Sequence, residues 1–124
     1  MILVDTSIWI DHFRKLDSTL QELLDAGQVL CHPYVIGELS VGNLYDRTLT
    51  LRRLSELPMI TGETHERVLK FIAHNSLFGT GLGYIDMHLL AAMRLAPEVS
   101  IWTRDRRMLK AAERLAVDHV RENN

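Results

Sequence analysis

The sequence predicts an α/β fold in which a short parallel β-sheet is flanked by helices on both faces. Short apolar runs of strand length alternate along the chain with longer segments that carry apolar residues at helical spacing. Parallel strands need crossover connections, which are nearly always right-handed, so helices are expected to cover the sheet. The 124 residues are about the size of one domain, and we expect a single domain over residues 1–124.

The chain begins with an apolar run, Ile2–Val4, which predicts a buried strand followed by a helix capped by Thr6 or Ser7. A second helix is expected over residues 17–27, because Asp or Ser favours a helix start and Gly a helix end. Val29–Cys31 then predicts the second strand.

Proline and glycine delimit the central elements. Pro33 is expected to open a helix that ends near Gly42–Asn43 and carries Glu38 early in its length. Asp46 begins another helix that Pro58 stops, after which a minimal strand is expected. The remaining predicted elements are, in order, that strand at Met59–Ile60, a helix starting at Thr61 or Gly62, a loop at Gly79–Gly83, a helix from Tyr84 to about Leu95, a strand at Ser100–Thr103, a helix from Asp105 to about Ala116 and a strand at Val117–Val120.

Four acidic residues are expected at one edge of this sheet: Asp5, Glu38, Asp86 and Asp105, which we call the acidic quartet. Asp5 and Asp105 directly follow strands, whereas the other two lie near helix starts, and these ends share the edge where open α/β sheets bind ligands. Four unpaired carboxylates would repel one another. Bound Mg²⁺ or Mn²⁺ would relieve that repulsion, so the quartet predicts a metal site.

A structural role is the alternative for each acidic residue, because helix N-termini favour acidic caps. Asp86 and Glu38 fit that alternative less well, since apolar neighbours surround them in sequence and burial of an unpaired carboxylate is costly.

The segments that carry the quartet are ILVDTSIWI, VIGELSVG, GLGYIDMHLLAAM and IWTRDRRM. In this order, and spread over nearly the whole chain, they resemble the PIN-domain family, and within it the VapC-type toxins. The resemblance implies that the quartet is catalytic and holds the metal, and that Ser7 and Thr103 are supporting hydroxyls. It leaves open which carboxylates contact the metal directly and which through water, and we expect Asp5 and Asp86 to be direct ligands.

The resemblance further implies an endoribonuclease that uses Mg²⁺ or Mn²⁺ and is the toxin of a toxin–antitoxin pair. Water activated by the metal would attack the RNA phosphodiester in line and leave 5′-phosphate and 3′-hydroxyl ends, with no protein nucleophile. The expected partners are an RNA substrate with a single-stranded loop, a small antitoxin whose C-terminal segment covers the active-site groove, and a second copy in a homodimer.

The net charge of −2 argues against a nucleic-acid partner at first sight. The proposed ligands contribute to that charge, however, and two bound divalent cations would bring it to +2. A basic cluster near Asp105 is a candidate for RNA phosphate binding, although a solvated face is an equal alternative; it contains Arg104, Arg106, Arg107 and Lys110.

Two other functions stay open at this point. A phosphoacceptor receiver domain shares the length and the alternation, but it needs an acidic pair at the first strand and an aspartate after the third, where Met59–Ile60 leads into Thr61 and Gly62. A catalytically inactive PIN fold that only binds other proteins would have little reason to carry all four carboxylates.

The remaining features predict an ordinary cytoplasmic protein. Cys31, the only cysteine, cannot form an intramolecular disulfide and is expected to be a buried thiol. No apolar run approaches the ~18 residues of a membrane span, and the start lacks a basic leader region. The six histidines show no zinc-binding spacing and are expected to be structural or on the surface.

Overall fold

Three short parallel strands lie at the centre of the structure, a computed structural model that describes residues 1–122. They are β1 (Ile2–Val4), β2 (Val29–Leu30) and β3 (Ser100–Trp102), in the spatial order β2-β1-β3. Leu3 of β1 is opposite Leu30 on one side and Ile101 on the other. The first strand of the chain is therefore the central one, and the N–H of the residue that follows it, Asp5, donates to the carbonyl oxygen of Trp102 at the end of β3, at 2.9 Å.

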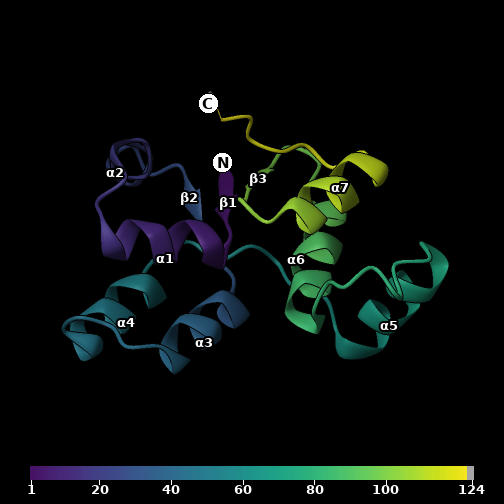
Figure 1. Cartoon of the computed structure of the whole chain (residues 1–124), viewed down its shortest axis with the longest axis horizontal. Coiled ribbons are helices and arrows are strands. Elements are labelled where there is room, and N and C mark those ends of the chain that lie inside the picture. The colour runs from purple at the N-terminus through teal and green to yellow at the C-terminus, as the bar shows by residue number, and fades with distance from the viewer. Residues whose placement is uncertain (123–124) are drawn as a thin grey trace.

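Helices lie on either side of these strands (Figure 1), with α1 to α4 grouped on one side and α5 to α7 on the other. This arrangement confirms the predicted α/β fold. The helices are α1 (Thr6–Arg14), α2 (Ser18–Asp25), α3 (Pro33–Val41), α4 (Arg47–Ser55), α5 (His65–His74), α6 (Tyr84–Leu95) and α7 (Arg106–Arg114).

The core forms where the sheet meets these helices. Leu3, Val4 and Ile101 are fully buried, and α6 buries seven consecutive residues, from Met87 to Met93. A helix that is apolar nearly all round belongs inside a domain, so α6 is held on several sides. Its N-terminal turn, which carries Asp86, is thereby fixed at the edge of the sheet.

Two predicted strands are wrong. Met59–Ile60 contributes only a single bridge, from Met59 to Cys31, and Pro58 next to it has no N–H to extend the pairing. Val117–Val120 likewise contributes only His119, which bridges to Ile101. Each segment therefore pairs with the sheet through one residue only and does not form a strand.

Two predicted helix starts are also wrong. Asp5, not Thr6 or Ser7, is the residue before α1, and no side chain caps that helix. α5 starts at His65, later than expected, because the hydroxyl of Thr64 accepts the hydrogen bond from the Arg67 N–H. Within the described residues, no helix is both long enough and apolar enough to cross a membrane.

Candidate active site

Asp5 stands at the end of the central strand and is almost completely buried, with 4% of its surface exposed. Its Oδ2 atom accepts hydrogen bonds from Ser7 Oγ at 3.0 Å and from Thr103 Oγ1 at 2.7 Å. The two hydroxyl oxygens are themselves 3.4 Å apart. The hydroxyl groups of half-buried Ser7 and buried Thr103 thus fix the orientation of this carboxylate.

The turn between β3 and α7 holds these two hydroxyls in place. The Arg104 N–H donates to Ser7 Oγ at 3.1 Å, and the Asp105 N–H donates to Thr103 Oγ1 at 3.1 Å. The end of β3 is therefore tied to the end of β1 through side chains, and Asp105 is positioned relative to Asp5.

Asp105 also caps α7, because its Oδ1 accepts from the N–H groups of Arg107 at 2.8 Å and Met108 at 3.3 Å. The structural role that we considered for this residue is thus real. It engages only one of the two carboxylate oxygens and does not exclude a second role.

Glu38 reaches the same region from α3. The residue lies in the middle of this helix rather than early in it, and it is exposed, so the expectation that its apolar neighbours would bury it is wrong. The hydroxyl of Thr6 at the start of α1 donates to Glu38 Oε1 at 2.9 Å. Sequence reasoning missed Thr6, because a threonine that follows a strand is usually interpreted as a helix cap.

Asp86 lies half-buried in the first turn of α6, where its Oδ2 accepts from the Gly83 N–H at 3.1 Å. Burial raises the pKa of Asp86 to about 6, the Gly83 hydrogen bond opposes that rise, and the charges of Asp5, Asp105 and Glu38 add to it. The charges of the other three carboxylates therefore act on Asp86, which lies near enough to feel all of them.

Each member of the acidic quartet has one oxygen held by hydrogen bonds, and its other oxygen accepts none from residues 1–122. In the same part of the chain, no three His, Cys, Asp or Glu side chains converge closely enough to bind an ion directly. Hard carboxylate oxygens suit Mg²⁺ or Mn²⁺, and Mg²⁺ commonly keeps several of its waters. The donor set therefore fits a divalent ion that some of these carboxylates contact through water.

The basic cluster next to Asp105 divides into two parts. Arg104 forms salt bridges with Asp11 at 2.7 Å, Asp17 at 3.0 Å and Glu122 at 2.8 Å, and these carboxylates raise its pKa. Its charge is therefore neutralised within the protein, which leaves it a poor ligand for RNA phosphates. In contrast, the other three cations of the cluster form no salt bridge within residues 1–122.

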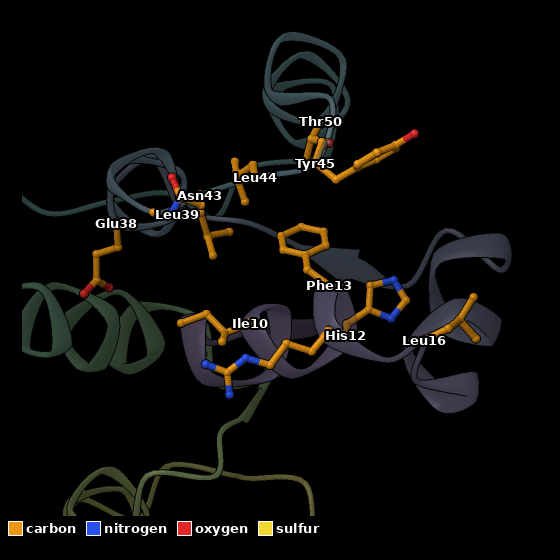
Figure 2. Close-up of a pocket in the computed structure, with 12 residues that line it drawn as sticks. Ile10, His12, Phe13, Leu16, Glu38, Leu39, Asn43, Leu44, Tyr45 and Thr50 are labelled. Atoms are coloured by element: carbon orange, nitrogen blue, oxygen red, sulfur yellow. The ribbon is translucent and has the colours of Figure 1, made fainter.

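A groove of about 680 Å³ lies between α1 and the α3–α4 segment and has Glu38 among its lining residues. Figure 2 shows Ile10, Phe13, Leu39 and Leu44 around this space and Glu38 at one end. Ile10 and Phe13 are about 40% exposed, which is unusual for large apolar side chains that pack side by side. We call this feature the apolar groove.

Histidines and tyrosines gather where α3, α5 and α6 begin. The ring of His88 contacts the rings of Tyr34 and Tyr84 edge to face. Burial lowers the pKa of His32 to about 4 and also lowers that of His88. Both imidazoles are therefore neutral at physiological pH. This is the structural role expected for these histidines.

Cys31 is buried, as predicted, and burial raises the pKa of its thiol to about 11. A thiol that stays protonated and inaccessible is a poor nucleophile. The reaction at this site therefore does not use the only cysteine of the chain.

Comparison with known proteins gives one family and two relatives. The family model described as "PIN domain" matches residues 2–114, which include the whole acidic quartet. Two proteins named "Ribonuclease VapC32", from Mycobacterium tuberculosis strains CDC 1551 / Oshkosh and ATCC 25618 / H37Rv, are each 45% identical to this chain over 112 residues. The aligned region covers 90% of this chain and 90% of each relative.

Proposed function

Because this chain belongs to the PIN-domain family, we propose that it is a divalent-metal-dependent endoribonuclease and the toxin of a toxin–antitoxin pair, with its nuclease domain over residues 1–124. The observation that carries this proposal is the acidic quartet, in which Asp5 and Asp105 follow β1 and β3 while Glu38 and Asp86 come from α3 and α6. Its members come from four different elements, and each keeps one carboxylate oxygen unbonded within the described residues.

The acidic quartet would hold the ion or ions, with Mg²⁺ or Mn²⁺ as the suitable choice for an all-oxygen site. A bound ion of this kind supplies the charge that activates a water and offsets the charge that develops on the phosphate. Ser7 and Thr103 keep Asp5 oriented through two hydrogen bonds, so this carboxylate needs little rearrangement when it becomes a ligand.

The remaining cations of the basic cluster, Arg106, Arg107 and Lys110, would contact RNA phosphates. All three lie in the first two turns of α7, immediately after Asp105. Phosphate contacts position a nucleic acid without reading its sequence, so these residues would set the affinity and leave sequence preference to other groups.

Substitution of the proposed ligands tests this function. Asp5→Asn and Asp86→Asn each remove one ligand charge, and we expect both variants to lose nearly all RNA cleavage while circular dichroism shows an intact fold. Asp25→Asn changes an exposed aspartate on α2 and serves as the matched control. The cut ends should carry 5′-phosphate and 3′-hydroxyl groups. Turnover at the wild-type rate in either ligand variant would refute the assignment.

The apolar groove is the proposed docking site for the antitoxin. Its lining suits a segment with several apolar side chains, and the carboxylate of Glu38 at one end suits a basic residue of that segment. Such a segment would cover both the groove and part of the acidic quartet, and cleavage would stop.

A change in the groove tests this docking. We expect Phe13→Ser to weaken antitoxin binding and to leave RNA cleavage by the isolated protein intact, because Phe13 lines the groove and is 41% exposed. Unchanged neutralisation of this variant in co-expression would place the antitoxin elsewhere. The expected homodimer is tested by light scattering of the purified protein, for which a monomeric mass is the contrary result.

A further inference from the structure

Three cations share one face of α7. Arg107, Lys110 and Arg114 stand at positions i, i+3 and i+7, which lie above one another on a helix. Together with Leu77 and Thr80 from the segment before α6, they line a cavity of about 400 Å³. We call this cavity the α7 pocket.

The positive charge of the α7 pocket is not neutralised by the protein. None of its three cations forms a salt bridge with a carboxylate among residues 1–122. Arg107 donates to the Gly81 carbonyl oxygen at 3.3 Å, and Arg114 donates to the Ser76 carbonyl oxygen at 3.0 Å. Carbonyl contacts orient a guanidinium but leave its charge, so the pocket suits an anionic ligand.

Phe78 provides an exposed aromatic ring close in the chain to this pocket. It directly follows Leu77, which lines the pocket as Thr80 does, and 68% of its surface is exposed. A basic groove flanked by an aromatic ring is the combination that binds single-stranded nucleic acid, because phosphates contact the cations while a base stacks on the ring.

The α7 pocket begins next to the acidic quartet. The Arg107 N–H donates to Asp105 Oδ1 at 2.8 Å, and the helix then carries the positive charge about 10 Å further to Arg114. The apolar groove instead borders the carboxylate of Glu38, and Arg14 is the only lysine or arginine among the residues that line it. The electrostatic path for a polyanion therefore leads from the quartet along α7.

We propose that the α7 pocket binds the single-stranded RNA segment that flanks the scissile phosphate. Arg107, Lys110 and Arg114 contact successive stretches of its backbone, and Phe78 stacks on one of its bases. This inference rests on the proposed ribonuclease function and names the surface along which the substrate leaves the acidic quartet.

Salt-dependent binding tests the proposal. A labelled single-stranded RNA oligonucleotide of mixed sequence is titrated with the full chain carrying Asp5→Asn, which prevents cleavage, and the fluorescence anisotropy is followed over a range of salt concentrations. Each single variant, Arg107→Ala, Lys110→Ala or Arg114→Gln, should reduce the slope of log affinity against log salt by about 0.7, the value for one phosphate contact on a single strand. Glutamine at position 114 removes the charge and keeps an amide N–H group, although Arg114 donates to the carbonyl oxygens of both Asn75 and Ser76.

The proposed stacking of Phe78 on a base should change the affinity for RNA but not its salt dependence. Phe78→Ala should lower the affinity roughly tenfold, since loss of one stacked base has an effect of this order, while the salt slope stays unchanged. Lys70→Ala removes an exposed lysine from α5 and is the matched control, with no change expected in affinity or slope. Slopes that are unchanged in all three cation variants would overturn the proposal.

A phosphate competition and a separate cleavage assay distinguish failure of the RNA-binding proposal from failure of the proposed ribonuclease function. Inorganic phosphate, added at constant ionic strength, should not displace the RNA. If phosphate displaces it and the slopes are unchanged, the α7 pocket binds a small anion, and the proposal is overturned. Cleavage by the chain with an intact quartet is measured separately. If the slopes change as expected, the binding role of the α7 pocket is supported even when the chain with an intact quartet does not cut RNA. If that chain cuts RNA and the slopes are unchanged, the role of the α7 pocket is refuted and the proposed ribonuclease function is not.

Discussion

At the scale of single residues, the site depends on how its carboxylates are held. Asp5 is the most constrained of them, because two hydroxyls donate to the same oxygen and the backbone after β3 fixes both hydroxyls. Outer contacts of this kind commonly tune metal affinity as much as the ligands themselves. The effect of Thr103 should therefore be measurable without any change to the quartet.

Thr103→Val removes the hydroxyl and keeps the shape of this buried side chain. We expect the Mg²⁺ concentration that gives half-maximal cleavage to rise by about 10- to 100-fold, because Asp5 loses its shortest hydrogen bond, of 2.7 Å. Thr103→Ser, which keeps the hydroxyl, should stay close to the wild type. An unchanged Mg²⁺ requirement in the valine variant, with the fold verified by circular dichroism, would show that Thr103 has no influence on the metal site.

Asp86 gives a prediction about stability. Its pKa in the folded protein is about 6, above its ordinary value of 3.8, so the folded state binds the proton more tightly than the unfolded state. Ionisation of Asp86 therefore destabilises the metal-free protein as the pH rises from about 4 to 6, and the full cost persists above that range. Asn cannot ionise and can still accept from the Gly83 N–H.

We accordingly expect Asp86→Asn to raise the melting temperature of the metal-free protein by a few degrees at pH 7.5. The gain should shrink below pH 6 and vanish near pH 4. Thermal unfolding in EDTA at several pH values measures this difference. A variant that is less stable than the wild type at pH 7.5 would contradict the raised pKa of Asp86.

The sequence led to the acidic quartet through local signals, which were the end of an apolar strand for Asp5 and Asp105 and apolar neighbours for Glu38 and Asp86. The second signal holds for half-buried Asp86 and fails for exposed Glu38. The sequence could not predict the partners of Arg104, since Asp11, Asp17 and Glu122 are distant from it in the chain. The neighbours of Arg104 in sequence are Asp105 and other cations, and they suggested a basic surface where the fold surrounds this one guanidinium with three carboxylates.

At the scale of elements, local chemistry predicts helix starts well where a side chain actually caps the helix. Asp17 was expected at the start of α2, and its Oδ1 accepts from the Leu20 N–H at 3.0 Å. That hydrogen bond is also the main cause of its lowered pKa, followed by the opposing effect of burial and by Arg104. Asp17 thus has two roles that substitution can separate.

Asp17→Ala removes both the cap and the salt bridge, and we expect the free energy of unfolding to fall by about 1 kcal/mol or more. Asp17→Asn keeps a side-chain acceptor for the Leu20 N–H and loses only the half-exposed ion pair, so it should be intermediate. Denaturant unfolding of the three proteins gives the order. Equal losses in the two variants would assign the whole effect to Arg104.

The errors at this scale have one physical cause. Met59–Ile60 and Val117–Val120 have the apolar composition of strands, but a strand needs a partner along its length, and each finds only one bridging residue. Similarly, Thr61 and Gly62 have the composition of a helix start, yet Thr64 makes the capping bond. The composition of a segment shows which secondary structures it can adopt. Its neighbours in the folded protein decide where a strand or helix begins and ends.

At the scale of the whole molecule, the acidic quartet separates two surfaces of opposite character. The apolar groove is lined from α1, α3 and α4 and the α7 pocket mainly from α7. Figure 1 shows α1, α3 and α4 on one side of the strands and α7 on the other. An inhibitor that occupies the groove and a substrate that follows α7 would compete only at the quartet. A net charge of −2 is compatible with this proposal, because the three cations of the α7 pocket lie together on one helix and form no salt bridge with a carboxylate among residues 1–122.

The most direct test of metal-dependent RNA cleavage by the acidic quartet is the response of cleavage to metal removal and return. The purified protein, free of antitoxin, is treated with EDTA, assayed on a structured RNA, and assayed again after Mg²⁺ or Mn²⁺ is added back, with Asp5→Asn as the blank. We predict that cleavage disappears in EDTA and returns with the ion in the wild type only. Cleavage that persists under full chelation, or that returns equally in Asp5→Asn, would contradict the account.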